Sequence, residues 1–297
     1  MFEIKKVIQQ AVILLVVFCM SDLIAGNSKA YINGSIHTFD ENLTVTESIL
    51  VKDGVIELVG SQADVIKNAD ESIEIVDLQG RMMMPSFHDA HAHPIWNGMD
   101  FLQCSVFDLL TINEIQDRIR ACLEEDHVKT SGWVVGAGLN AGLFPAANPN
   151  KSLFDEVSVD IPIYIEMSDG HNALVNTKAL ELAGINRDTK DPFKGIIERD
   201  PITGEPSGTL REPSAMNLIA DVLPTETSEL RLNGLIYAQN LASSFGITSM
   251  IDAAVNEPYL ISFKDLAEKG ELNLRITACI EYGRQHYVQE FSGFEDV

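Results

Sequence analysis

The sequence has little of several things that would define a protein class. Cysteine occurs only four times in 297 residues, which is too few for a disulfide scaffold, and no CxxC pair is present. Basic residues number 21 against 44 acidic ones, a net charge of −23, which does not favour nucleic acid as a partner. The sequence also contains no GxSxG nucleophile segment and no glycine-rich phosphate loop. With 45% hydrophobic and 22% charged residues, the composition is that of a globular protein.

Long hydrophobic runs are also missing, apart from AVILLVVFCM at residues 11–20. Lysines precede this run and small or polar residues follow it, which is the layout of a secretory signal. The run is short beside the roughly 20 apolar residues of a membrane span. We therefore predict that residues 1–25 are a signal peptide and that the protein is exported, to the periplasm or secreted, with cleavage after Ala25 or Ala30. The alternatives are an uncleaved N-terminal anchor and a cytosolic start.

Residues 26–84 indicate a small β unit. Apolar, β-branched stretches at 48–52 and 55–59 flank the dipeptide Asp53-Gly54. Two strands around a two-residue Asp-Gly turn are a strong signal for a β-hairpin. A further strand is expected at 73–76.

Beyond about residue 86, the sequence predicts alternating helices and strands. Thr111 and Glu114 form a capping box that starts a helix. Further helices are expected at 176–184, 228–245 and 258–269, and strands at 133–136, 162–167, 247–251 and 274–280. Glycines end several of these helices, and the alternation is typical of a parallel α/β architecture.

The stretch most informative about chemistry is MMMPSFHDAHAHP, residues 82–94. Because side chains alternate along a strand, Asp89, His91 and His93 are expected on one face and His88 on the other. Two imidazoles on one face can bind one metal ion, and imidazole suits zinc. Asp89 is then expected to orient one of these ligands by a hydrogen bond. The alternative is a polar strand end with incidental histidines.

In this context, the stretch resembles the amidohydrolase superfamily. There, a β-sandwich assembled from both chain ends precedes a (β/α)₈ barrel whose first strand ends in HxH. Further segments are similar to the amidohydrolase 3 family and occur in its order: GWVVG at 132–136, DGH at 169–171, GEPSGTLRE at 204–212 and GITSMID at 246–252. One departure is Asn140, where the family usually carries an aspartate, and this difference bears on substrate preference rather than on the fold.

The resemblance implies an α/β fold, namely an incomplete (β/α)₈ metal-dependent hydrolase barrel with the N-terminal part of a composite β-sandwich. Residues 85–297 then hold barrel strands 1–3, interrupted by a large insertion at about 95–245 and truncated afterwards. The remaining metal ligands and the aspartate general base are expected beyond Val297. A barrel left open after its third strand has an exposed edge, so self-association through that edge is expected.

Other candidate residues come from the same family segments. His171 is expected to point into the active-site cleft as a catalytic residue that binds or polarises a substrate carbonyl, with Asp169 also contacting substrate. Glu212 is a candidate metal or substrate ligand. The alternatives are a histidine hydrogen-bonded inside the insertion and an ordinary ion-paired glutamate. The cysteines after the N-terminal segment stand in apolar surroundings and are predicted to be buried thiols: Cys104, Cys122 and Cys279.

We predict from the resemblance a hydrolase that acts on non-peptide, amide-like carbon–nitrogen bonds of a small-molecule substrate. A divalent metal, zinc in the first instance, would lower the pKa of a water molecule and polarise the scissile carbonyl. One alternative is a non-catalytic truncated fragment that binds metal weakly or docks to another chain. Another keeps the hydrolase but changes the bond to a cyclic amide or an ester.

Overall fold

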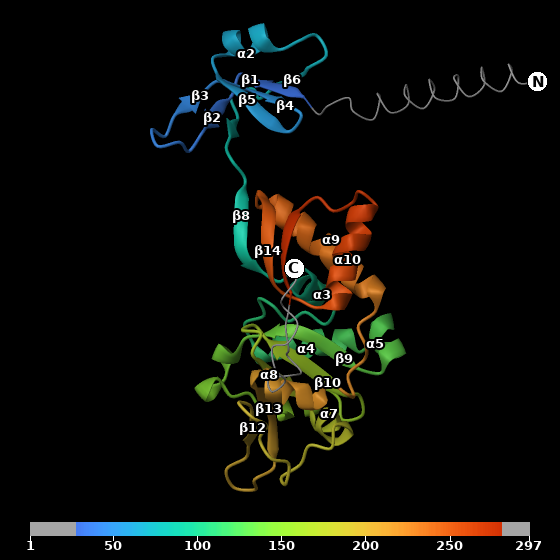
Figure 1. Ribbon diagram of the computed structural model, residues 1–297. Coiled ribbons are helices and arrows are strands. Elements are labelled where there is room, and N and C mark those ends of the chain that lie inside the picture. The colour runs from blue at the N-terminus through green and yellow to red at the C-terminus, as the bar shows by residue number, and fades with distance from the viewer. Residues whose placement is uncertain (1–27, 281–297) are drawn as a thin grey trace, which may run out of the picture. The chain divides into compact units, whose positions relative to one another are not determined.

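A computed structural model describes residues 28–280 and shows two compact units that meet in sequence between Ser86 and Phe87 (Figure 1). The predicted signal peptide falls on residues outside the described range. Among the described residues, no helix has both the length and the apolar character needed to span a membrane.

The first unit is built from two small sheets. The larger has the strand order β5-β4-β1-β6, with β1 antiparallel to β4 and parallel to β6, and the smaller has the order β3-β2-β7. The elements are β1 (Lys29–Ile32), β2 (Ser35–His37), β3 (Val45–Thr46), β4 (Ser48–Lys52), β5 (Val55–Gly60), α2 (Gln62–Asn68), β6 (Glu74–Asp77) and β7 (Met82–Met83).

The hairpin predicted around the Asp-Gly dipeptide is confirmed. Asp53 and Gly54 have φ values of 50° and 78°, and a two-residue turn with both residues in the left-handed region matches the twist of the flanking strands β4 and β5. Helix α2 was not expected from the sequence. It contributes Val65 to a small buried cluster with Ala30 and Leu50, so the helix closes one side of the larger sheet.

The second unit contains a parallel three-stranded sheet with the order β15-β14-β8. Figure 1 shows β8 and β14 side by side, with α9 and α10 packed beside the sheet. The sheet and its helices comprise β8 (Phe87–Ala92), α3 (Pro94–Leu102), α9 (Ser228–Ser244), β14 (Ile247–Val255), α10 (Glu257–Glu268) and β15 (Arg275–Ile280). Within residues 28–280 this sheet does not close into a barrel, so the architecture established here is a mixed α/β fold.

The segment between α3 and α9 forms a separate five-stranded sheet with the order β12-β13-β11-β10-β9. Only β9 and β10 are parallel in it, which corrects the expectation of a parallel architecture for this segment. The reason is that β10 and β11 are joined by a tight turn, and such a turn can connect only antiparallel strands. The strands are β9 (Val134–Leu139), β10 (Ile163–Met167), β11 (Asn172–Val175), β12 (Ile196–Arg199) and β13 (Pro206–Arg211).

Short helices surround this second sheet. The capping box predicted at Thr111 and Glu114 is present at the start of α4, with both reciprocal hydrogen bonds formed. The helices are α4 (Ile112–Cys122), α5 (Asp126–Ser131), η2 (Ala141–Leu143), η3 (Pro145–Ala147), α6 (Ser152–Asp155), α7 (Thr177–Leu182), α8 (Glu212–Met216) and η4 (Asn217–Ile219).

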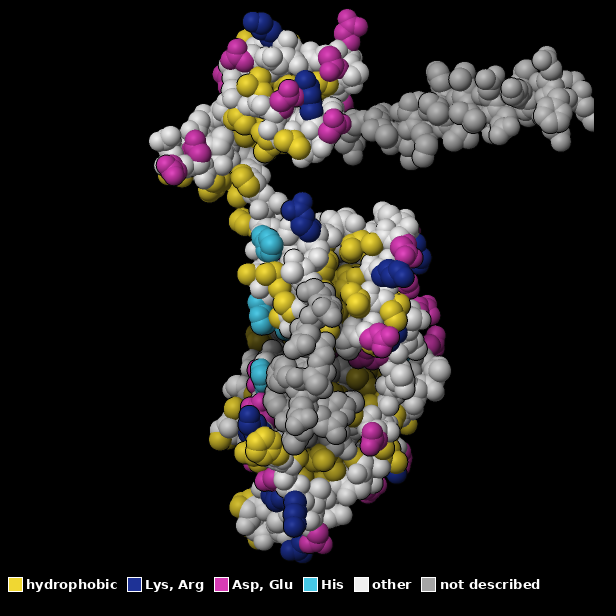
Figure 2. All heavy atoms as spheres, viewed as in Figure 1, with side chains coloured by type: hydrophobic (Ala, Val, Ile, Leu, Met, Phe, Trp, Pro, Cys, Tyr) yellow, Lys and Arg dark blue, Asp and Glu magenta, His cyan; other side chains and the backbone are white. Residues whose placement is uncertain are grey.

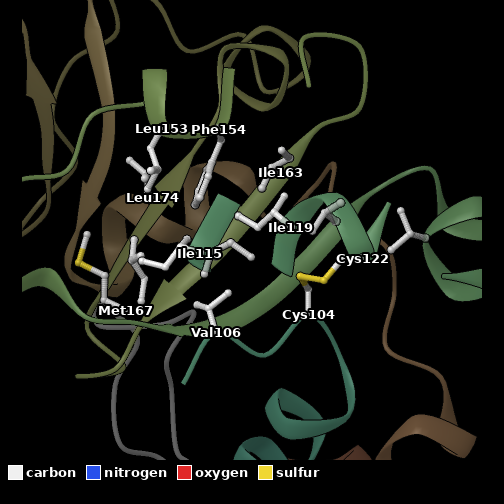
Figure 3. Packing of buried hydrophobic residues seen from close by; sticks show 14 residues of the cluster. Cys104, Val106, Ile115, Ile119, Cys122, Leu153, Phe154, Ile163, Met167 and Leu174 are labelled. Atoms are coloured by element: carbon white, nitrogen blue, oxygen red, sulfur yellow. A yellow bond between two sulfur atoms is a disulfide. The ribbon is translucent and has the colours of Figure 1, made fainter. Parts of the chain in front are cut away.

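The largest buried cluster packs α4 and α6 against one face of the five-stranded sheet (Figure 3). Cys104 and Cys122 lie in this cluster and form a disulfide, while Cys279 is a free, exposed cysteine. The expectation of three buried thiols is therefore wrong. Cys104 and Cys122 come together because α4 folds back over the segment that precedes it. Their separation of 18 positions in the sequence does not indicate this contact.

Candidate metal and substrate site

The two histidines of the HxH pair lie where β8 passes into α3. β8 ends at Ala92, His93 is the cap residue, and a proline occupies the first helical position, where its missing N–H costs no hydrogen bond. The His91 and His93 rings stand edge to face with their centroids 5.2 Å apart. Both line a cavity of about 470 Å³, whereas His88 does not. The alternation predicted along this strand is consistent with that placement.

Asp252, near the carboxyl end of β14, is the carboxylate beside an imidazole ring of this pair. Its Oδ1 lies 3.6 Å from Nδ1 of His93, and the Asp252 side chain is only 1% exposed. Burial raises the pKa of the Asp252 carboxyl. Two contacts oppose this rise in pKa: the N–H of Ala254 donates to Oδ1 at 3.2 Å, and His93 lies nearby. In the sequence, Asp252 is the last residue of the GITSMID segment, and no local pattern there indicates a role in the site.

Asp89 contacts the backbone of the HxH pair. Its Oδ1 accepts a hydrogen bond from the backbone N–H of His91 at 3.0 Å. The contact therefore steadies the main chain of a candidate ligand. Orientation of an imidazole ring by Asp89 stays a prediction, and the ring contact in this structure belongs to Asp252.

Helix α3 presents one face to the same cavity. Trp96, Asn97 and Asp100 line it, at the spacing of successive turns. Asp100 is 8% exposed, and its Oδ2 accepts a long hydrogen bond of 3.5 Å from Asn97. Burial raises the pKa of Asp100 to about 7; the Asn97 hydrogen bond opposes this rise and the charge of Glu226 adds to it. The sequence contained no pattern that would single out Asp100.

The DGH segment, in the turn between β10 and β11, also lines this cavity. Asp169 accepts from the backbone N–H of His171 at 2.9 Å and from the side chain of Asn172 at 2.7 Å, so both of its oxygens hold the turn. Gly170 has a φ of 69°, in the left-handed region that glycine adopts without strain. The structure thus brings His171 and Asp169 to the cavity that the HxH pair lines.

Glu212 is not brought to the HxH pair in the described structure. Its carboxylate Oε2 lies 3.5 Å from Nδ1 of His171, and its backbone N–H donates to the carbonyl of His171 at 2.7 Å. Glu212 and His171 also line an adjoining cavity of about 310 Å³ that includes Phe193 and Lys194. Glu212 has a φ of 67°, a strained value for a residue with a side chain, at the junction of β13 and α8. The geometry therefore associates Glu212 with His171, and a metal-ligand role stays a prediction without a geometric partner.

The residues present fit a divalent metal in part. Nδ1 of His93 and Oδ2 of Asp252 are buried and make no hydrogen bond among the described residues. Such atoms are expected where a ligand or a small rotation completes the contacts. However, residues 28–280 contain no group of three or more histidine, cysteine or carboxylate side chains arranged to hold a metal ion. The two imidazoles thus fit as part of a ligand set, since catalytic zinc sites use three protein ligands.

A further cavity, of about 310 Å³, is lined by residues of α3 and α9 and by residues of β8 and β14. His91 and His93 line it at one end, and apolar side chains such as Phe101, Leu241 and Phe245 line the rest. The side chain of Phe245 is 67% exposed, and Figure 2 shows hydrophobic side chains reaching the surface of this unit. The side chains of Phe101, Leu241 and Phe245, called here the apolar strip, lie beside β8, which is an edge strand of the parallel sheet within residues 28–280.

Comparison with known proteins decides the family. The model of the amidohydrolase family matches residues 74–296, about three quarters of the chain. The chain belongs to the amidohydrolase family. The resemblance drawn from the HxH stretch and the segments that follow it is therefore confirmed.

Curated relatives of this amidohydrolase come from plants and bacteria. The protein LONG AFTER FAR-RED 3 of Arabidopsis thaliana is 31% identical over 74% of this chain and 37% of its own length. The N-substituted formamide deformylase of Arthrobacter pascens is 32% identical over 62% of this chain and 34% of its own length. The putative amidohydrolase YtcJ of Bacillus subtilis is 34% identical over 64% of this chain and 36% of its own length. The chain thus spans about a third of the length of these relatives.

A solved structure shows the same fold. An uncharacterised metal-dependent hydrolase from Pyrococcus horikoshii matches 85% of this amidohydrolase and 48% of its own chain, with a TM-score of 0.62 and 24% identity. A second, from Pyrococcus furiosus, has a TM-score of 0.60 and 21% identity. At these identities the likeness concerns the fold alone.

Proposed function

We propose that this amidohydrolase takes part in the metal-dependent hydrolysis of a carbon–nitrogen bond in a small, amide-like substrate. The observation that carries the proposal is that His91, His93 and His171 all line one cavity of about 470 Å³. Family membership supports hydrolysis, and a relative named for deformylation of N-substituted formamides supports the choice of an amide-like bond.

In this proposal, His91 and His93 hold a divalent metal, with zinc as the first choice because imidazole nitrogen is a preferred zinc ligand. A bound divalent metal supplies the Lewis acidity that activates water and polarises a carbonyl. His171 lines the same cavity, which supports the proposal that it hydrogen-bonds a substrate oxygen. The apolar ring of Trp96 and the buried Asp100 border the volume and limit the water around the substrate.

The test begins with metal binding. Wild-type chain is titrated with Zn²⁺ against a chromophoric chelator, beside the variants His91→Ala, His93→Ala and His88→Ala. We expect the first two to lose most of the bound zinc, because each removes one of two imidazoles that share the cavity. His88→Ala is the matched control on the same strand, and we expect it to bind zinc as the wild type does. Equal losses from all three variants would contradict the assigned strand faces.

Turnover is measured on the same zinc-loaded protein with a simple N-alkyl formamide, following release of the amine. Amine release that depends on zinc and disappears in His91→Ala supports the hydrolase. Zinc binding without amine release favours instead the non-catalytic alternative, in which the chain binds metal but lacks part of the catalytic set.

We also propose that the protein is exported. The N-terminal pattern of lysines followed by an apolar run supports this, and so does the Cys104–Cys122 disulfide, since disulfides persist mainly in oxidising compartments. N-terminal sequencing of protein recovered from a bacterial host should then find a mature start after Ala25 or Ala30. An intact N-terminus in the soluble fraction would contradict the cleaved signal.

A further inference from the structure

The inference concerns how His93 is held. A neutral imidazole carries one N–H, and a second group that accepts this N–H decides which ring nitrogen keeps its lone pair for a ligand. In the described structure, the carboxylate beside Nδ1 of His93 is that of Asp252, at 3.6 Å. Trp96 lies against the same ring, with the centroids 5.6 Å apart. Carboxylate and indole thus bound the His93 ring.

The contact between Asp252 and His93 follows from the parallel pairing of β14 with β8. Asp252 on β14 is in register with Ala92 on β8, directly before His93. The parallel pairing therefore brings the end of the GITSMID segment to the end of the HxH segment, although Ala92 and Asp252 are 160 positions apart in the sequence. Asp252 itself is held by the N–H of Ala254, which donates to Oδ1.

Both facing groups also have unused hydrogen-bonding capacity. Nδ1 of His93 and Oδ2 of Asp252 are buried and make no hydrogen bond within the described part of the chain. Buried polar atoms are normally satisfied, and an N–H donating to a carboxylate sits at about 2.8 Å. A small rotation of either side chain closes the 3.6 Å separation and satisfies the imidazole nitrogen.

We propose that Asp252 is the positioning residue of His93: its carboxylate accepts the Nδ1–H, so that Nε2 faces the cavity as the ligand nitrogen. A carboxylate in this place also increases the basicity of the opposite nitrogen. The inference rests on the proposed function for its purpose, because a fixed Nε2 matters only if the cavity binds a metal. Its geometry stands without the metal.

The first measurement needs neither a variant nor a metal. Long-range ¹H–¹⁵N correlation spectra of the metal-free, ¹⁵N-labelled chain identify the protonated nitrogen of each histidine, with His93 assigned by its loss in His93→Ala. We expect His93 in the Nδ1–H tautomer. In Asp252→Ala, which removes both acceptor oxygens beside the His93 ring, we expect that preference to be lost. An Nε2–H tautomer in the wild type, or an unchanged Nδ1–H tautomer in Asp252→Ala, would overturn the proposal.

The second measurement uses Zn²⁺ alone in the chelator competition. We expect Asp252→Asn to weaken zinc binding about 10- to 100-fold. Asp160→Asn is the control: it is the same substitution on an exposed carboxylate of the same unit that lines neither cavity beside the histidines, and we expect little change. Equal weakening by both variants would overturn the proposal. If the wild type shows the Nδ1–H tautomer but binds no zinc, the orientation by Asp252 stands and the proposed function fails.

Discussion

Asp100 offers a sharp test of the electrostatics beside the cavity. The perturbation is Asp100→Asn, which keeps the size and shape of a buried side chain on α3 and removes its ability to ionise. The groups that act on it electrostatically are known: Asn97 donates to it, Glu226 adds a like charge, and the buried phenols of Tyr164 and Tyr259 feel its charge in turn. No cation appears among these neighbours in the described structure.

The magnitude follows from the pKa. Ionising a carboxyl whose pKa rises from 3.8 to about 7 on folding costs about 4 kcal/mol, at about 1.4 kcal/mol for each step in pKa. Below about pH 4 the carboxyl is protonated in both states and costs nothing. Between about pH 4 and 7 the unfolded chain has released the proton and the folded protein has kept it, so stability falls as the pH rises. Above about pH 7 the loss is complete and constant.

The assay is denaturant unfolding from pH 4 to 8, followed by tryptophan fluorescence. Both tryptophans of the sequence, Trp96 and Trp133, lie in the second unit, so the signal reports that unit alone. We expect Asp100→Asn to match the wild type near pH 4 and to exceed it by up to about 4 kcal/mol at pH 8. The exposed Asp160 provides the control variant Asp160→Asn, which should run parallel to the wild type. A constant difference between Asp100→Asn and the wild type across the range would refute the reasoning.

Further predictions concern the second unit. Replacing Cys104 and Cys122 together by alanine removes a disulfide that spans 18 positions, and we expect the free energy of unfolding to fall by about 3 kcal/mol. Alanine at the exposed Cys279 should change the free energy of unfolding little. Equal free energies of unfolding for both variants would count against the disulfide. Gly98→Ala should destabilise the second unit by about 1–3 kcal/mol, because the new methyl group would overlap the backbone of α9. An unchanged midpoint of thermal unfolding would contradict this close contact between α3 and α9. We also expect concentration-dependent association in sedimentation velocity, through the apolar strip and the edge of β8 that has no strand partner among residues 28–280. A monodisperse monomer at high concentration would speak against it.

Much of the local structure could be read from the sequence. The Asp53-Gly54 hairpin, the capped helix after Thr111 and the strands and helices of the last 50 described residues are all present, because their signals are short-range. Turn dihedrals, capping hydrogen bonds and apolar periodicity involve residues a few positions apart. Helix α2 was missed because its seven residues bury only Val65, which leaves too little apolar periodicity to recognise.

The sequence by itself determined the family and the HxH pair, since both are carried by residues adjacent in the chain. It also indicated which histidines of that stretch line the same cavity, because alternation along a strand is a local rule. Only the tertiary structure decided the partners of these residues. It paired Cys104 with Cys122, set Asp252 rather than Asp89 beside an imidazole ring, and used Glu212 to contact His171. These contacts depend on strand register and on how helices fold back over sheets, and they join residues from 18 to more than 150 positions apart, a distance over which the order of amino acids alone does not fix which side chains meet.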